Sequence, residues 1–367
     1  MHHADHPDHA GRSRRTWLAT IAPVAVLAAA LLGLTACGAD EGPHLALTAA
    51  LPQKTPKGTE IRIGDPAAQA AIQAAGLDKE LAADGVKVAW ADLSGGPQTI
   101  QAFRGGKLDC GAVADIPSLF AAWTGTSTKI IFQSVTVDPL KYPIYQLGIA
   151  PGEHITTLAD LKGKKIAYSP GQAQGALVLR VLKKAGLTQK DVHLVEMTSV
   201  NDTYVTALGS KAVDVAPLAA ANLKIYAAKY PGSSSLHTGI RDDASTLYCL
   251  TDSLEDADKA AALKDYVAVR TKALLWVNDH PDEYAKAYYQ DVEGLNEADA
   301  KWSVQVGGKD GIPKTWDNAV KRLQETADLL SQEQGHKKLD VEDLVDRRFE
   351  KVEAQAAGGH VVTGDAS

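Results

Sequence analysis

The pattern of apolar and polar residues predicts a repeated unit of strand, turn and helix. Its most complete instance spans Thr157–Gly186. A short apolar strand at Lys165–Tyr168 precedes a glycine-rich turn, and apolar residues at helical spacing then run over Ala176–Ala185. At such a junction the N–H groups and the dipole of the helix start favour an anion. The turn at Gly171–Gly175 is therefore predicted to be one wall of a ligand cleft; the alternative is an ordinary turn in a parallel sheet.

The first part of the chain repeats this unit. The predicted strands are Glu60–Gly64, Val86–Trp90, Leu108–Ala114 and Ile130–Val137, and the predicted helices are Ala67–Ala75, Thr99–Arg104 and Leu119–Trp123. Because parallel strands end at one edge of a sheet, the turns that follow them are expected to meet there. Pro97 and Pro117 are typical of a first helical turn, where the next N–H groups remain free.

A second lobe is predicted between two crossing strands, Tyr145–Ala150 and Ser245–Leu250. It contains further strands at Val192–Met197 and Lys211–Ala216, and beyond Asp256 the chain is predicted to be mostly helical. The fold class is therefore α/β, with two lobes that are each a mainly parallel sheet flanked by helices. Lobe I comprises residues 59–147 plus 246–352 and lobe II comprises 148–245. The two crossings imply a hinge that lets the lobes close on a ligand.

The N-terminal region is predicted to direct export. Residues 1–36 form a signal peptide with three arginines before the apolar stretch Ile21–Leu34, which is too short for a stable membrane span. The sequence Leu34–Cys37 resembles a bacterial lipobox, so Cys37 is expected to be lipidated and to anchor the protein to the outer face of the cell membrane. Ser13–Leu18 resembles a twin-arginine motif, with a generic Sec leader as the open alternative. Residues 37–58 are predicted to be a lipid-anchored linker and 353–367 a disordered tail.

Composition limits the function without naming it. The 367 residues are 45% hydrophobic and 23% charged, which is ordinary for a globular protein and sufficient for two modest cores. The formal net charge is −7, and no basic patch suits nucleic acid. In an exported protein the two remaining cysteines, Cys110 and Cys249, are either a disulfide or two buried free thiols.

Three segments carry a specific resemblance: Gly85–Ala122, Leu158–Val192 and Lys338–Phe349. They resemble the solute-binding lipoproteins of ABC importers for aliphatic sulfonates, nitrate and taurine, and the likeness extends in order over Ile61–Phe349. It implies a type II periplasmic-binding-protein fold whose lobes close on a small organic anion. The implied partners are the solute, an ABC permease with its ATPase and, through the lipid, the membrane. The resemblance implies a monomer without cofactor or metal.

The resemblance also implies a ligand site at three turns. Its residues are Ser94, Gly95, Gly96, Pro97 and Gln98; Asp115, Ile116, Pro117 and Ser118; and Gly171, Gln172, Ala173 and Gln174. These are helix starts of the kind that bind anions through N–H groups, so a sulfonate needs no arginine there. Asn201 and Pro217 are placed at the same pocket, and Asp65 and Asp115 at its rim. The two aspartates either bind a cationic or zwitterionic group of the ligand or only cap helices.

The chain departs from the family pattern at two walls of this pocket. After Asp214, the family's aromatic residues and aspartate are replaced by Val215–Leu218, so this wall loses bulk and a carboxylate. At the Gly171–Gly175 turn, expected serines are replaced by Gln172, Ala173 and Gln174. A wider or more apolar solute is therefore compatible with the sequence.

Three classes of function remain open. A transport receptor without catalysis is the prediction, with sulfonate, nitrate or an aromatic or zwitterionic solute as alternative ligands. An enzyme of the same fold, like the pyrimidine-precursor synthases, would need a histidine and a cysteine-rich iron motif. The histidines here are scattered, and besides Cys37 the chain has only Cys110 and Cys249. No HExxH, GxSxG or Walker pattern is present. A structural surface lipoprotein is the third class, and the hinge argues against it.

Overall fold

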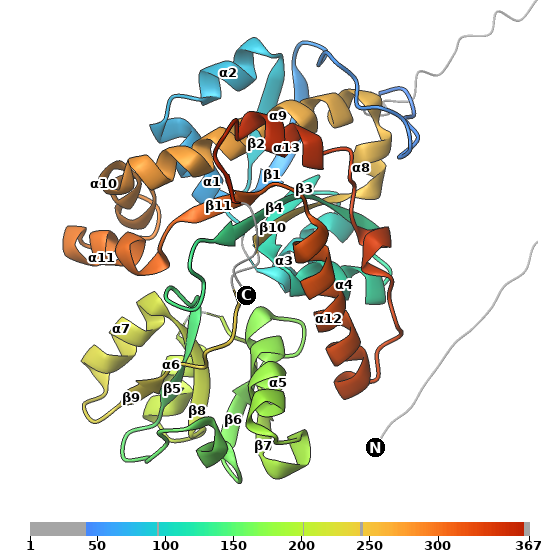
Figure 1. Cartoon of the computed structure of the whole chain (residues 1–367). Helices are drawn as coiled ribbons and strands as arrows, with labels where there is room; N and C mark the ends of the chain where they lie inside the picture. The colour runs from blue at the N-terminus through green and yellow to red at the C-terminus, as the bar shows by residue number, and fades with distance from the viewer. Residues whose placement is uncertain (1–41, 94, 201, 243–244, 363–367) are drawn as a thin grey trace, which may run out of the picture. The chain divides into compact units, whose positions relative to one another are not determined.

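The structure is a computed structural model that describes residues 42–93, 95–200, 202–242 and 245–362. Within these residues the strands form two separate sheets (Figure 1). The seven-stranded sheet has the order β12 (Val361–Val362), β11 (Asp310–Pro313), β4 (Thr128–Thr136), β10 (Ser245–Leu250), β3 (Cys110–Ala114), β1 (Thr59–Gly64) and β2 (Val86–Trp90). The five-stranded sheet has the order β7 (His193–Glu196), β6 (Lys165–Tyr168), β8 (Val215–Ala219), β5 (Tyr145–Ile149) and β9 (Ser234–Leu236).

Helices accompany both sheets. Those belonging to lobe I are α1 (Pro66–Ala74), α2 (Asp78–Ala83), α3 (Gly96–Arg104), α4 (Ile116–Trp123), α8 (Thr251–Glu255), α9 (Ala257–Asp279), α10 (Pro281–Tyr284), the π-helix η3 (Ala285–Gln290), α11 (Glu297–Gly307), α12 (Asp317–Gln334), η4 (Val341–Leu344) and α13 (Glu350–Ala356). Those of lobe II are η1 (Leu158–Leu161), α5 (Ala173–Ala185), η2 (Gln189–Asp191), α6 (Thr203–Gly209) and α7 (Ala220–Lys229). None of the described helices has the length and apolar character that crossing a membrane requires.

The α/β class with two sheets is confirmed, but the expectation of mainly parallel sheets is wrong. β1 pairs in parallel with β2 and β3, whereas β10 is antiparallel to both β3 and β4. In the second sheet β6 is parallel to β7 and β8, and β5 is antiparallel to β8 and β9. Every antiparallel pair includes β4, β5 or β10, the strands next to the two segments that join the sheets. The chain runs into these strands from the opposite edge of the sheet.

Some element boundaries differ from those predicted. The bounds of β2 and β10 are as predicted, while α3 and α4 begin three residues early because Pro97 and Pro117 lie in their first turns. β8 starts at Val215 rather than Lys211, since Lys211 has a φ of 59° that no strand accommodates. β5 already belongs to the second sheet from Tyr145 onward, so the first crossing precedes residue 148.

Apolar packing places α12 against both lobes. Leu323 and Leu330 of α12 share one core with Leu119 of α4 and with Leu177 and Leu182 of α5. Contacts of α12 with both α4 and α5 are consistent with this shared core (Figure 1). A second core lies between the seven-stranded sheet and α9. The C-terminal helices therefore position lobe I against the helix that follows the glycine-rich turn.

The predicted linker is packed against lobe I over its described part, which corrects the expectation of a free tether. The backbone N–H of Gly42 donates to Asp256 Oδ2 at 2.8 Å, and that of Leu45 donates to the Glu255 carbonyl at 2.6 Å. Thr55 Oγ1 bonds Asp265 Oδ2 at 2.6 Å. The sequence of the linker alone could not indicate this packing, because the contacts join residues about 210 positions apart. Cys37 and the residues up to 41 lie outside the described residues.

The predicted disordered tail is likewise ordered as far as Val362. Glu353 of α13 has an exposed fraction of 0%, and its Oε2 accepts a hydrogen bond from Trp316 Nε1 at 2.7 Å. β12 pairs in parallel with β11. Burial raises the pKa of Glu353 well above its usual value, despite the lowering effect of the Trp316 hydrogen bond. A glycine- and alanine-rich composition indicated fraying, but docking on the core overrides that local preference.

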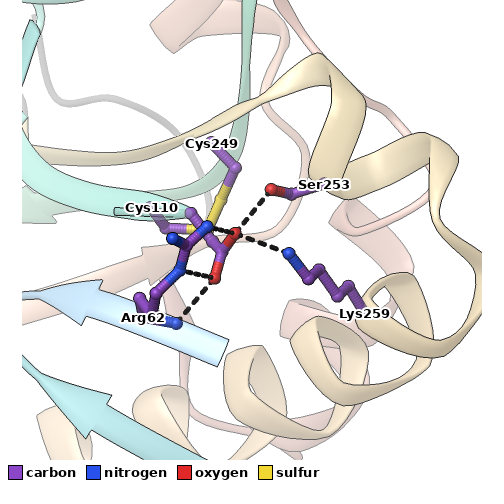
Figure 2. Close-up of a disulfide and its surroundings, with 6 residues drawn as sticks. Arg62, Cys110, Cys249, Ser253 and Lys259 are labelled. Carbon is purple, nitrogen blue, oxygen red and sulfur yellow. Dashed lines mark hydrogen bonds and ion pairs between the residues drawn. A yellow bond between two sulfur atoms is a disulfide. The ribbon is translucent and has the colours of Figure 1, made fainter. Parts of the chain in front are cut away.

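A disulfide joins Cys110 of β3 to Cys249 of β10, directly across the antiparallel pair (Figure 2). Beside it lies the fully buried carboxylate of Asp109, which accepts from Arg62, Ser253 and Lys259 at 2.7–3.0 Å. Burial by itself raises the pKa of Asp109, but the hydrogen bonds and positive charges of Arg62 and Lys259 outweigh it and lower the pKa to about 2. Together these groups tie β1 and β3 to the helices after β10.

Candidate functional site

Helix starts from lobe I meet at one edge of its sheet. α1, α3 and α4 follow β1, β2 and β3, which run in the same direction, so their first turns lie at the same edge. A methyl group added at Gly96 would lie 2.6 Å from Pro117 Cγ, so the starts of α3 and α4 touch and the site admits only glycine. This geometry brings two of the three predicted turns together.

The predicted residues of these two turns differ in their exposure and in their hydrogen bonds. Pro97 and Gln98 are exposed, and the Gln98 amide lies close to Gly95. Ile116, Pro117 and Ser118 are buried, and Ser118 Oγ donates to the Asp115 carbonyl at 2.7 Å. The Ser118 hydroxyl is therefore already hydrogen-bonded within its own turn. Ser94 lies outside the described residues.

The glycine-rich turn of lobe II lies against α4. A methyl group added at Gly171, whose φ is +83°, would lie 3.2 Å from the ring of Phe120. Farther along α5, Arg180 Nη2 lies 3.1 Å from Asp115 Oδ2. The turns near residues 96, 117 and 171 thus lie close to α4.

The two glutamines of this turn bind a neighbouring loop. Gln172 Oε1 accepts from the Ser199 N–H at 2.9 Å, and Gln174 Nε2 donates to Ser199 Oγ at 3.0 Å. Their amides therefore hold the loop after β7 to the start of α5, and the half-buried Ala173 opens the helix between them. Pro217 is buried inside β8 opposite Leu147, not at a helix start. Asn201 lies outside the described residues.

The two predicted rim aspartates have different surroundings. Asp65 caps α1, since its Oδ1 accepts from the Ala68 N–H at 3.0 Å. Asp115 precedes α4 but makes no capping hydrogen bond with its side chain; its carboxylate pairs with Arg180 instead. Asp65 therefore caps α1 and also pairs with Arg270, whereas the carboxylate of Asp115 links α4 to α5 without capping.

A cavity of about 290 Å³ opens beside the start of α1. Its polar lining includes Asp65, Ser134, Ser245, Asp310 and two tyrosines, and its apolar lining comes mainly from alanine, valine and leucine. Burial raises the pKa of both tyrosines, Tyr284 and Tyr288, and nearby acidic and phenolic groups add to the effect. The hydroxyls therefore stay protonated at any physiological pH, and that of Tyr288 is hydrogen-bonded to Glu293.

Arg270 of α9 is the residue of this cavity that sequence reasoning missed. Its exposed fraction is 6%, its Nε donates to Asp65 Oδ2 at 2.8 Å, and its guanidinium lies 3.9 Å above the ring of Phe132. A signal was present in the sequence. Tyr266, Val267, Ala273 and Leu274 surround Arg270 at helical spacing, and a charge on an apolar helix face is unusual without a partner.

No group of three or more side chains suited to binding a metal ion is found within the described residues. The cysteines that could supply a thiolate, Cys110 and Cys249, are joined to each other. The chemistry that the site offers is thus hydrogen bonding from helix starts, tyrosines and one buried guanidinium.

Comparison with known proteins gives consistent results. A family model described as NMT1/THI5 like matches residues 81–284. A relative from Bacillus subtilis (strain 168), named as an aliphatic sulfonates-binding protein, is 27% identical over 91% of this chain and 98% of its own length. A protein of the same name from Escherichia coli (strain K12) is 33% identical, but that alignment spans only 34% of this chain and 36% of the relative.

Solved structures share the fold. The alkanesulfonate-binding protein from Xanthomonas axonopodis pv. citri, solved with MOPS bound, has a TM-score of 0.66 at 22% identity and covers 81% of this chain and 99% of its own. A desulfurization enzyme also matches, with a TM-score of 0.58 at 15% identity over 81% of this chain and 99% of its own. At these identities the likeness establishes the fold, which binding proteins and an enzyme both use.

Proposed function

The chain belongs to the NMT1/THI5-like family, and on that premise we propose that it is an exported solute-binding lipoprotein of an ABC importer. It captures a small organic anion of the sulfonate type between its two lobes and delivers it to the permease, whose ATPase drives import. The sulfonate class is supported by the names of the relatives, one of which aligns over 91% of the chain.

One observation supports this proposal above the others. The starts of α3 and α4 touch at Gly96 and Pro117, and Gly171 of lobe II faces Phe120 of α4. Helix starts that follow strands of two different sheets therefore lie close to α4. Each exposed helix start favours an anion by roughly 0.3–1 kcal/mol, and more when water is excluded, so several together bind a small anion. Closure of the lobes would exclude that water.

A receptor accounts for the chemistry better than an enzyme of the same fold. Both cysteines of the described chain are in a disulfide, so neither provides a thiolate nucleophile or an iron ligand. The polar groups near α4 are paired with each other, as in Asp115 with Arg180, and do not form a base-and-nucleophile pair. Binding without chemical change is the function that these residues support.

Ligand binding is expected to raise the melting temperature of the full-length mature protein. A ligand that binds only the folded state at 100 times its Kd adds about 2.7 kcal/mol of stability. The screen compares alkanesulfonates, taurine, MOPS, nitrate, sulfate esters and aromatic acids by thermal unfolding, with sodium chloride at equal ionic strength as control. A concentration-dependent rise with a sulfonate supports the proposal. A rise only with nitrate, or only with aromatic acids, would move it to the alternative receptors, and no rise with any compound would contradict it.

Lipidation is expected to depend on a single residue. In a bacterial host the wild-type protein should fractionate with the membrane, because diacylglycerol on Cys37 adds two acyl chains. The variant Cys37→Ser should appear in the soluble exported fraction with its mass lacking the lipid. Lys79→Ser is the control, since Lys79 is exposed on α2 and its replacement should leave membrane fractionation unchanged. Equal membrane fractions for wild type and Cys37→Ser would refute the anchor.

A further inference from the structure

The cavity beside α1 contains an arginine with unused hydrogen-bonding capacity. A guanidinium has five N–H donors; Arg270 donates from Nε to Asp65 Oδ2, and its side chain also interacts with Tyr266. Its Nη1 is buried without a hydrogen-bond partner among the described residues. A buried donor left without an acceptor costs about 1–3 kcal/mol, so such groups are rare unless a ligand completes them. The ion pair with Asp65 therefore leaves part of the hydrogen-bonding capacity of Arg270 unused.

Asp65 holds Arg270 in a fixed orientation. One carboxylate oxygen caps α1 at Ala68, and the other accepts from Arg270 Nε, so the ion pair has a single geometry. Stacking of the guanidinium over Phe132 fixes its plane as well. A guanidinium so held is suited to bidentate recognition of a planar or tripodal oxyanion.

We propose that Arg270 binds the anionic head group of the solute in this cavity and that the apolar lining contacts the solute's organic tail. This inference rests on the proposed function and specifies its ligand. Ala71, Val113 and Leu274 line the cavity together with Tyr284 and Tyr288, whose rings stack on each other with centroids 5.6 Å apart. The helix starts around α4 are not among the residues that line this cavity, so the anion contact assigned here is that of Arg270 alone.

The charges of the lining select the kind of anion. Arg270 contributes one positive charge, whereas Asp65 and Asp310 each contribute one negative charge. A head group with two negative charges is repelled by these carboxylates more strongly than a head group with one. The lining therefore disfavours inorganic sulfate more strongly than it disfavours an organic monoanion such as a sulfonate with an apolar tail.

Isothermal titration of the full-length mature lipoprotein in detergent tests this assignment. The probes are 1-butanesulfonate, benzenesulfonate and inorganic sulfate. Arg270→Gln and Arg270→Lys are expected to raise the Kd for butanesulfonate roughly 10- to 100-fold, because a charge-assisted hydrogen bond is lost and lysine lacks the planar fork. Arg348→Lys is the matched control, since Arg348 pairs with Asp346 and does not line the cavity. Its Kd should stay within threefold of wild type.

A second kind of variant tests the cavity without changing Arg270, so the test does not depend on the folding of the arginine variants. Ala67→Leu fills part of the cavity from α1 and leaves the Arg270–Asp65 pair in place. It should weaken butanesulfonate binding at least tenfold while the far-ultraviolet circular dichroism stays native. Wild-type binding with all three cavity variants within threefold would overturn the role of Arg270 but leave the proposed function standing. Sulfate binding as tight as butanesulfonate would overturn the ligand class, and a wild type that binds no probe would overturn both proposals.

Discussion

Reduction of the Cys110–Cys249 disulfide is expected to lower the free energy of unfolding by about 2–5 kcal/mol. The bond closes a loop of 139 residues, which includes all of lobe II and both crossings, so it removes much of the freedom of the unfolded chain. It also joins β3 to β10, the strand by which the chain returns to the first sheet. Denaturant unfolding of the wild-type protein with and without dithiothreitol measures the effect without changing any side chain.

The double variant Cys110→Ala/Cys249→Ala supplies the control for this measurement. Its stability should be low and insensitive to dithiothreitol, whereas that of the wild type should fall on reduction. Alkylation of the unreduced, denatured protein followed by mass measurement should find no thiol at either position. Two alkylated cysteines in the non-reduced wild type would contradict the disulfide and support the alternative of two buried thiols.

Asp109→Ala should destabilise lobe I by about 2–4 kcal/mol. Removal of this carboxylate leaves the positive charges of Arg62 and Lys259 without their partner. The lower end allows for the partial exposure of Arg62 and Lys259, at 32% and 28% of their side chains. Urea unfolding monitored by fluorescence measures the loss. Glu60→Ala in β1, the strand that carries Arg62, is the matched control, because its pair with Lys87 is exposed and should contribute no more than about 1 kcal/mol. Equal losses in the two variants would show that the buried network adds nothing.

The pKa of Asp109 also predicts an acid dependence. Because its pKa is lowered to about 2 from 3.8, the ionised carboxylate stabilises the folded state above pH 3.8, and this stabilisation is lost as the pH falls through 2. The shift corresponds to about 2 kcal/mol at neutral pH. Between pH 5 and pH 2 the wild type should lose more stability than Asp109→Asn. Parallel pH profiles for the two proteins would contradict the assignment.

Much of the fold could be predicted because its signals are local. Alternation at Val86–Trp90 and Ser245–Leu250 gave the correct bounds of two strands, and the prolines at 97 and 117 located two helix starts. The family resemblance was likewise readable from contiguous segments and is confirmed by the family model and the relatives. A strand period or a first-turn proline is a property of a few neighbouring residues, so no tertiary information is needed.

Parts of the site could not be predicted, because they are made by distant residues. Arg270 and Asp65 lie 205 residues apart in the chain, and only the packing of α9 against α1 makes them partners. Gln172 and Gln174 were expected to face a ligand, yet both bind Ser199. Which acceptor a side chain uses depends on competition among neighbours that the fold brings together, and the sequence does not list those neighbours.

The sequence by itself determined the class of fold, the order of most elements, the family and the prolines in the first turns of two helices, because each depends on short-range periodicity or on contiguous motifs. Only the tertiary structure decided that the linker and the tail dock on lobe I, that the strands linking the two sheets run antiparallel to their neighbours, and that an arginine enters a cavity beside α1. These outcomes depend on burial and on hydrogen bonds between segments about 50 to more than 200 residues apart, where the free energy of packing overrides local preference.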